Sequence, residues 1–135
     1  MKKVSFILVA AGICLALCAC AKMQGSEERV RDLPFSVLDE SAIPENLLSE
    51  IEKRKTEPFE YIFSDREYTY ICIGYGEQKT KGYSVAVDDL YLTKEAVYAE
   101  TTLLGPQTKR TAVNEVSYPY IVIKTEYLEQ TIVVK

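Results

Sequence analysis

The stretch Tyr68-Thr-Tyr-Ile-Cys-Ile73 consists almost entirely of aromatic and β-branched residues, which are the types most enriched in β-strands. Successive side chains of a strand point to opposite faces of the sheet. Tyr68, Tyr70 and Cys72 would therefore share one face, and the residues between them would form the other. The stretch predicts a strand, and it makes sheet structure the starting point for interpreting the rest of the chain.

Similar short segments surround this strand, with turn-forming residues between them. They cover residues 59–63, 83–87, 96–104, 118–124 and 131–134. Short strands that follow one another with turn signals between them are typical of an antiparallel sheet.

One helix is expected ahead of these strands. Four apolar residues recur there at near-helical spacing: Ile43, Leu47, Leu48 and Ile51. Pro44 suits a first helical turn, and Pro58 prevents the helix from continuing. The predicted fold is mainly β within the α+β class. It is a single small antiparallel β-sheet domain, a sandwich or a partial barrel, of about 5–7 strands with one N-terminal helix.

The first residues have the layout of a secretory signal peptide. Lys2 and Lys3 precede an uncharged apolar run from Val4 to Leu17. This run is shorter than the roughly 20 apolar residues that a membrane span needs. A stop-transfer membrane span is the alternative interpretation.

The sequence Leu17-Cys-Ala-Cys-Ala-Lys22 resembles a bacterial lipobox, in which a small residue precedes the cysteine that is lipidated. Cys20 fits this role, whereas Cys18 fits less well because it follows the large Leu17. In the alternative, an ordinary signal peptide leaves Cys20 as a plain thiol. The expected organisation is a lipoprotein signal peptide at 1–19, a polar tether at 20–32 and a β domain at 33–135. The protein would be exported and lipid-anchored on the outer side of a bacterial cell membrane.

The composition disfavours several classes of function. Without Lys2 and Lys3, 14 of the 16 basic residues remain against 20 acidic ones, a net charge of −6 that argues against nucleic-acid binding. The chain has no histidine, which removes Ser–His and Cys–His nucleophile pairs and the commonest general base. Cys72 is interpreted as a buried small hydrophobe and not as a catalytic thiol. We therefore expect no enzyme activity, cofactor, metal site or small-molecule substrate.

Three of the chain's 6 glycines lie within residues 74–82. Gly74 at a strand end suggests a β-bulge, and Gly82 suggests a left-handed or crowded turn. The residues of this region form a candidate partner-binding loop: Tyr75, Gly76, Gln78, Lys79, Thr80, Lys81, Gly82 and Tyr83. In the alternative interpretation this is a hairpin whose glycines serve only its own geometry and whose Tyr83 packs in the core.

A second candidate site is the segment Tyr118, Pro119 and Tyr120, with Tyr75 and Tyr118 as possible aromatic anchors for a partner. Pro119 cannot donate a ladder hydrogen bond, so it suits the start of a strand or an edge strand. An edge strand could pair with a strand of a partner. The alternative is a strand entry with two packed tyrosines.

Residues 76–84 and 117–124 together resemble the family defined by the C-terminal domain of PrcB, a subunit of a bacterial surface protease complex. That family shows a G-x-x-x-T-G-G-Y-S-like turn and later a Tyr-Pro-Tyr-like strand entry, and here Lys81 replaces a glycine of the turn. The resemblance covers about residues 68–134. It implies a non-catalytic protein that associates with a secreted or surface protease, or with another envelope protein. Residues 79–83 also resemble a loop of chagasin-like cysteine-protease inhibitors, so the alternative is an inhibitor that presents residues 76–84.

Overall fold

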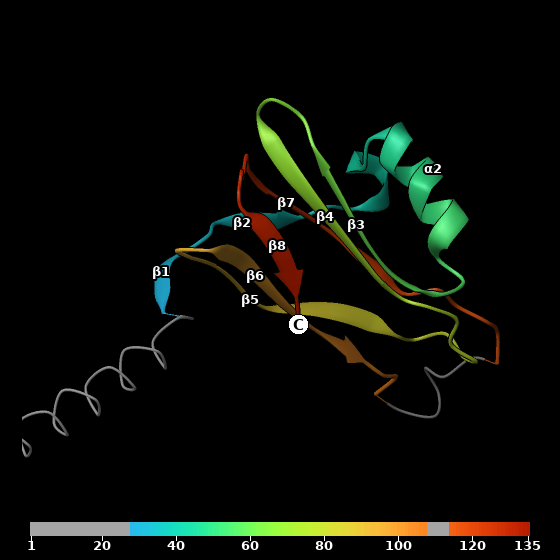
Figure 1. The fold of residues 1–135 in the computed structure, drawn as a ribbon. Helices are drawn as coiled ribbons and strands as arrows, with labels where there is room; N and C mark the ends of the chain where they lie inside the picture. The colour runs from blue at the N-terminus through green and yellow to red at the C-terminus, as the bar shows by residue number, and fades with distance from the viewer. Residues whose placement is uncertain (1–27, 108–113) are drawn as a thin grey trace, which may run out of the picture.

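Within residues 28–107 and 114–135, which a computed structural model describes, eight strands form two sheets of four strands each (Figure 1). The first sheet contains, in spatial order, β1 (Arg29–Asp32), β5 (Ser84–Thr93), β6 (Ala96–Leu104) and β8 (Thr131–Val134). The second contains β2 (Phe35–Val37), β7 (Tyr120–Glu126), β4 (Tyr68–Tyr75) and β3 (Pro58–Ser64). Neighbouring strands are antiparallel except β6 and β8, which run parallel.

The expected mainly β, α+β fold is confirmed, and of the two predicted architectures the chain adopts the sandwich. The number of strands exceeds the expected range because β1 and β2 are short and carry no strong strand pattern. Arg29–Asp32 lies in the segment expected to be a tether, yet it pairs with β5. An ion pair between Arg29 and Asp89 of β5, at 2.5 Å, supports this pairing. A second ion pair, between Arg31 and Glu126 at 2.9 Å, connects β1 to β7 of the other sheet.

The second sheet is the middle layer of three, and both of its faces are buried. Ile71 and Ile73 of β4 pack into a core shared with the first sheet. Tyr70 and Cys72 of the same strand pack into a second core beneath the helix α2 (Glu45–Arg54). Figure 1 shows α2 on the side of this sheet that faces away from the first sheet. The alternation expected in residues 68–73 is thus confirmed, with apolar packing on both sides.

The predicted helix forms, and a short 3-10 turn, η1 (Glu40–Ala42), precedes it. Pro44 is the N-cap, and its carbonyl oxygen accepts hydrogen bonds from the N–H groups of Leu47 and Leu48, both at 3.0 Å. Leu47 and Ile51 are buried against the sheet. No helix in the described part of the chain is both long and apolar enough to cross a membrane.

Candidate functional site

The two segments that the sequence singled out lie against each other at one end of the sandwich (Figure 1). The N–H of Gln78 donates to the carbonyl of Ser117 at 2.8 Å, and the N–H of Ser117 donates back at 3.0 Å. The Ser117 hydroxyl donates to the carbonyl of Thr80 at 2.7 Å, and the Tyr75 N–H donates to the carbonyl of Pro119 at 3.1 Å. We call residues 76–83 and 117–119 the bridged loops.

The hairpin alternative for the glycine-rich region is wrong. Strand β4 belongs to the second sheet and β5 to the first, so residues 76–83 carry the chain from one sheet to the other. The sequence could not show this, because a strand followed by a short loop and another strand looks the same in both cases.

The tip of the bridged loops is polar and exposed. Lys79 and Lys81 are both exposed, and Lys81 Nζ forms an ion pair with Glu115 Oε2 at 3.1 Å. Within the described residues, Lys79 forms no ion pair. The Gln78 side-chain amide donates to the Tyr75 carbonyl at 3.3 Å, which fixes the start of the loop. A backbone held by hydrogen bonds therefore presents two exposed cationic side chains.

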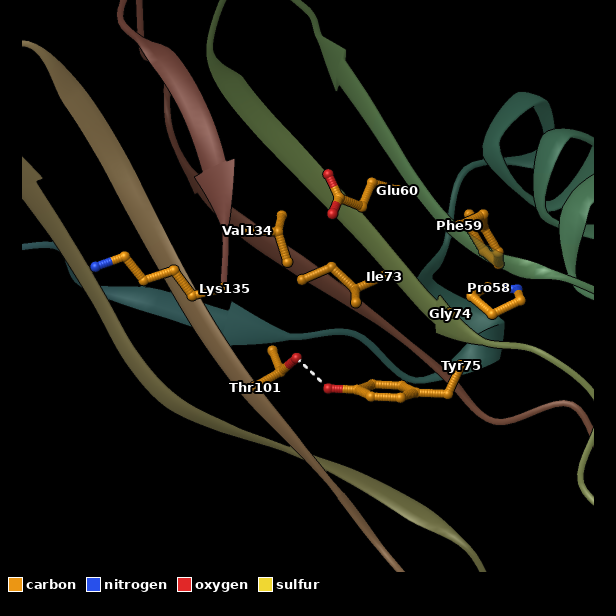
Figure 2. A pocket seen from close by; sticks show the side chains of 9 residues that line it. All are labelled: Pro58, Phe59, Glu60, Ile73, Gly74, Tyr75, Thr101, Val134 and Lys135. Carbon is orange, nitrogen blue, oxygen red and sulfur yellow. Dashed lines mark hydrogen bonds between the residues drawn. The ribbon is translucent and has the colours of Figure 1, made fainter.

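The tyrosines expected to anchor a partner are mostly occupied within the fold. The Tyr75 hydroxyl lies 2.6 Å from Thr101 Oγ1 and links the two sheets, as Figure 2 shows. Tyr120 packs against the helix core, and this burial raises its pKa above the usual value. Tyr118 is half-buried, and Lys55 Nζ lies 5.1 Å from its ring centroid. Tyr75 and Tyr120 are thus structural side chains.

The glycines of this region serve different purposes. Gly76 and Gly82 adopt positive φ angles of 77° and 98°, so the expectation of a left-handed backbone at Gly82 is confirmed. The expected bulge at Gly74 is wrong, because this residue pairs in regular register with both Phe59 and Tyr120. A Cβ at Gly74 would lie 2.1 Å from Cε1 of Phe59. Glycine is needed there to make room for that ring.

Of the two interpretations of residues 118–120, the strand entry is confirmed, because β7 begins at Tyr120, and the edge strand is wrong. Strand β7 lies between β2 and β4, and the edges of its sheet are β2 and β3. The sequence misled here because β2 has only three residues, which still suffice to cover residues 123–125 of β7.

A groove that sequence reasoning did not find opens between the outer edges of β3 and β8 (Figure 2). Its volume is about 460 Å³. Ile73, Tyr75, Thr101 and Val134 line its interior, and Glu60 lies at its β3 side. The residues come from four strands in two sheets, so the groove depends on packing that no local pattern reveals.

Cys72 is fully buried, which confirms the interpretation of this residue as a small hydrophobe. Burial disfavours the charged thiolate and raises the pKa of Cys72 to about 12. In the described part of the chain, no three His, Cys, Asp or Glu side chains are grouped so that they could hold a metal ion.

Cys72 is expected to react slowly with a chromogenic thiol reagent at pH 8, because the reactive thiolate is scarce and the sulfur is inaccessible. Labelling of native and urea-unfolded protein measures the difference. The Cys72→Ser variant shows which part of the labelling signal comes from Cys72. The free energy of unfolding of this variant should be lower by about 1–3 kcal/mol if the serine hydroxyl has no hydrogen-bond partner. Rapid labelling of Cys72 in the native protein would contradict its burial.

Comparisons with known proteins found one family model that matches the central strands. No curated protein and no solved structure matched the chain. A family model described as PrcB C-terminal matches residues 69–126, which run from β4 to the end of β7 and include the bridged loops. The helix α2 and strands β1, β2, β3 and β8 lie outside the match. Residues 69–126 of this chain are therefore similar to the PrcB C-terminal family.

Proposed function

We propose that this protein is a non-catalytic, lipid-anchored envelope protein that binds and helps to stabilise a secreted or surface protease, or another envelope protein. The match to the PrcB C-terminal family carries this proposal, since it indicates a role related to a protease complex. The bridged loops support a binding role, because hydrogen bonds on two sides hold an exposed polar tip in a defined shape. A preorganised loop loses little conformational entropy when it binds.

The residues available for chemistry support a non-catalytic role. The chain has no histidine, and the thiol of Cys72 is buried with a raised pKa. Asp88 and Asp89 have different partners. Asp88 accepts a hydrogen bond from the Thr102 hydroxyl, and Asp89 forms an ion pair with Arg29. These acids stabilise the first sheet and do not form a pair that could share a proton.

Replacing Lys79 and Lys81 together by alanine is expected to weaken association with the partner while leaving the fold intact. Both side chains are exposed, and the ion pair of Lys81 with Glu115 is of the surface type that contributes little. Stability should change by less than about 0.5 kcal/mol for each substitution. Thermal melts and capture of the partner from the native cell envelope measure the two effects.

The matched control replaces Lys53 and Lys94 by alanine. These lysines are also exposed, and their loss changes the net charge equally. Lys94 lies in the turn between β5 and β6, and Lys53 lies on α2. Normal partner capture by a well-folded Lys79/Lys81 variant would show that these lysines are not contacts.

The lipid anchor is tested at Cys20, which lies outside the described residues. Mass spectrometry of the mature N-terminus is expected to find a diacylglyceryl group on this cysteine. A free, unmodified start at Ala21 or beyond would contradict the anchor.

Titration against a panel of proteases separates a stabilising subunit from an inhibitor. A stabilising subunit leaves protease activity unchanged or prolongs its lifetime. Complete loss of activity at stoichiometric amounts would instead favour the alternative that residues 76–84 inhibit a protease.

A further inference from the structure

Strand β3 has an outer edge with unused backbone hydrogen-bonding groups. Among the residues that the structure describes, it pairs only with β4, and the Asp65 N–H donates to the Tyr68 carbonyl at 3.0 Å where the two strands meet. Antiparallel strands alternate between hydrogen-bonded and non-bonded residue pairs. Counting from Asp65, the backbone groups of Phe63 and Tyr61 face β4. Those of Ile62 and Glu60 therefore face away from the sheet.

The opposite side of β4 gives the same alternation independently. The Tyr75 N–H donates to the Pro119 carbonyl at 3.1 Å, so odd-numbered residues of β4 bond to β7. The even-numbered residues must then bond to β3. In register these are Cys72 opposite Tyr61 and Tyr70 opposite Phe63, which again leaves Ile62 directed outward.

The outer edge of β3 has little of the protection that edge strands usually carry. Proteins commonly block such edges with proline, bulges, charges or a covering segment. Here Pro58 lies at one end of the strand, Glu60 is its single charged residue, and the register of β3 with β4 is regular over all seven residues. Ile62 is 41% exposed. The edge from Glu60 to Ser64 is therefore open to a further strand.

The groove continues this edge toward the first sheet. Glu60 belongs to its lining, and alternate side chains of a strand added to β3 would point toward Ile73 and Val134. Main-chain pairing with an edge strand, combined with pockets for alternate side chains, is an established mode of peptide recognition.

Charge defines the chemistry of the occupant. The Glu60 carboxylate has no hydrogen-bond or ion-pair partner among the residues that the structure describes. The amine of Lys135 is directed away from the groove, since Nζ lies 4.4 Å from the ring centroid of Tyr98, and Figure 2 shows this orientation. The groove therefore combines an apolar interior with one unpaired negative charge at its β3 side.

We propose that β3 and the groove beside it bind an extended segment of a partner polypeptide, added as a fifth strand to the second sheet. The segment carries apolar side chains that enter the groove and a lysine or arginine that pairs with Glu60. This inference rests on the proposed function for the existence of a protein partner, and it names a binding site distinct from the bridged loops.

The test uses the full chain and a capped heptapeptide, Val-Thr-Val-Thr-Lys-Thr-Val, whose alternation places three valines and one lysine on the same face. Amide exchange measured by NMR should show the N–H groups of Tyr61 and Phe63 protected in the free protein and those of Glu60 and Ile62 unprotected. Adding the peptide should protect Ile62. Peptide-induced shifts confined to the bridged loops, or no saturable binding, would overturn the proposal. Protection of Ile62 that rises with protein concentration without peptide would also overturn it, since a second copy would then occupy the edge.

A charge exchange tests the predicted pairing. Glu60→Lys should weaken binding of the lysine peptide by about three- to fivefold, as for an exposed ion pair, and should strengthen binding of the same peptide with glutamate in place of its lysine. Glu95→Lys is the matched control, because Glu95 is exposed in the turn between β5 and β6 and changes the net charge equally. Equal effects of the two variants would overturn the role of Glu60.

The outcome separates this inference from the proposed function. Assembly with an envelope partner that is unaffected by Glu60→Lys, together with no peptide binding, overturns only the β3 site. Peptide binding at β3 in a protein that captures no envelope partner overturns only the proposed function.

Discussion

Replacing Gly76 with valine is expected to lower the free energy of unfolding by about 2–5 kcal/mol, because two costs combine. The φ angle of Gly76 is 77°, a region in which a β-branched residue is strained. A Cβ there would also lie 2.9 Å from Cδ and 3.0 Å from the backbone nitrogen of Pro58. The backbone of Pro58 cannot move aside as a flexible side chain could. Chemical denaturation of the variant measures the loss.

Gly82→Val is the matched control for this prediction. Gly82 also has a positive φ angle, but it is exposed in the bridged loops. Backbone strain alone should cost about 1–3 kcal/mol there. If the Gly76 variant were no less stable than the Gly82 variant, the contact with Pro58 would not matter. If Gly82→Val were as stable as the parent, the left-handed backbone would not explain this glycine.

Replacing Leu47 with alanine is expected to lower the free energy of unfolding by about 2–5 kcal/mol, the range for truncating a fully buried leucine side chain. Leu47 is 0% exposed and lies in the core between α2 and the second sheet. The cavity would form beside Cys72, which belongs to the same cluster. Thiol labelling of native protein should therefore become faster in this variant, in parallel with its lower denaturation midpoint.

Ser49→Ala controls for effects on the helix itself. Ser49 is exposed on α2, and alanine has the higher helix propensity, so stability should stay within about 0.5 kcal/mol of the parent. A Leu47→Ala variant that matched Ser49→Ala in both stability and labelling would mean that α2 does not cover Cys72.

Local patterns in the sequence predicted the parts of the fold that depend on neighbouring residues. The alternation in residues 68–73 gave the correct faces of β4, and apolar spacing gave the buried side of α2. The positive φ angle at Gly82 followed from its position in a short loop. In each case the information lies within one short segment of the sequence.

Features that depend on distant partners could not be predicted in this way. Gly74 makes room for Phe59, a residue that meets it only because β3 and β4 pair in one particular register. The loop at 76–83 joins two sheets, and β7 lies inside its sheet, because of long-range pairing that no short stretch records. The groove combines residues from β3, β4, β6 and β8, and so the candidate site at Glu60 escaped sequence reasoning altogether.

The spatial order β2-β7-β4-β3 determines the order in which the strands of this sheet can pair. Strands β3 and β4 are adjacent in sequence and can pair early, but β4 receives its second neighbour only when residues 120–126 have been made. Until then the apolar stretch 70–73 has an unpaired edge. Pairing between distant segments is slow, typically milliseconds to seconds for β-sandwiches. A partly folded chain in which only β3 and β4 have paired therefore exposes an aggregation-prone edge until β7 joins β4.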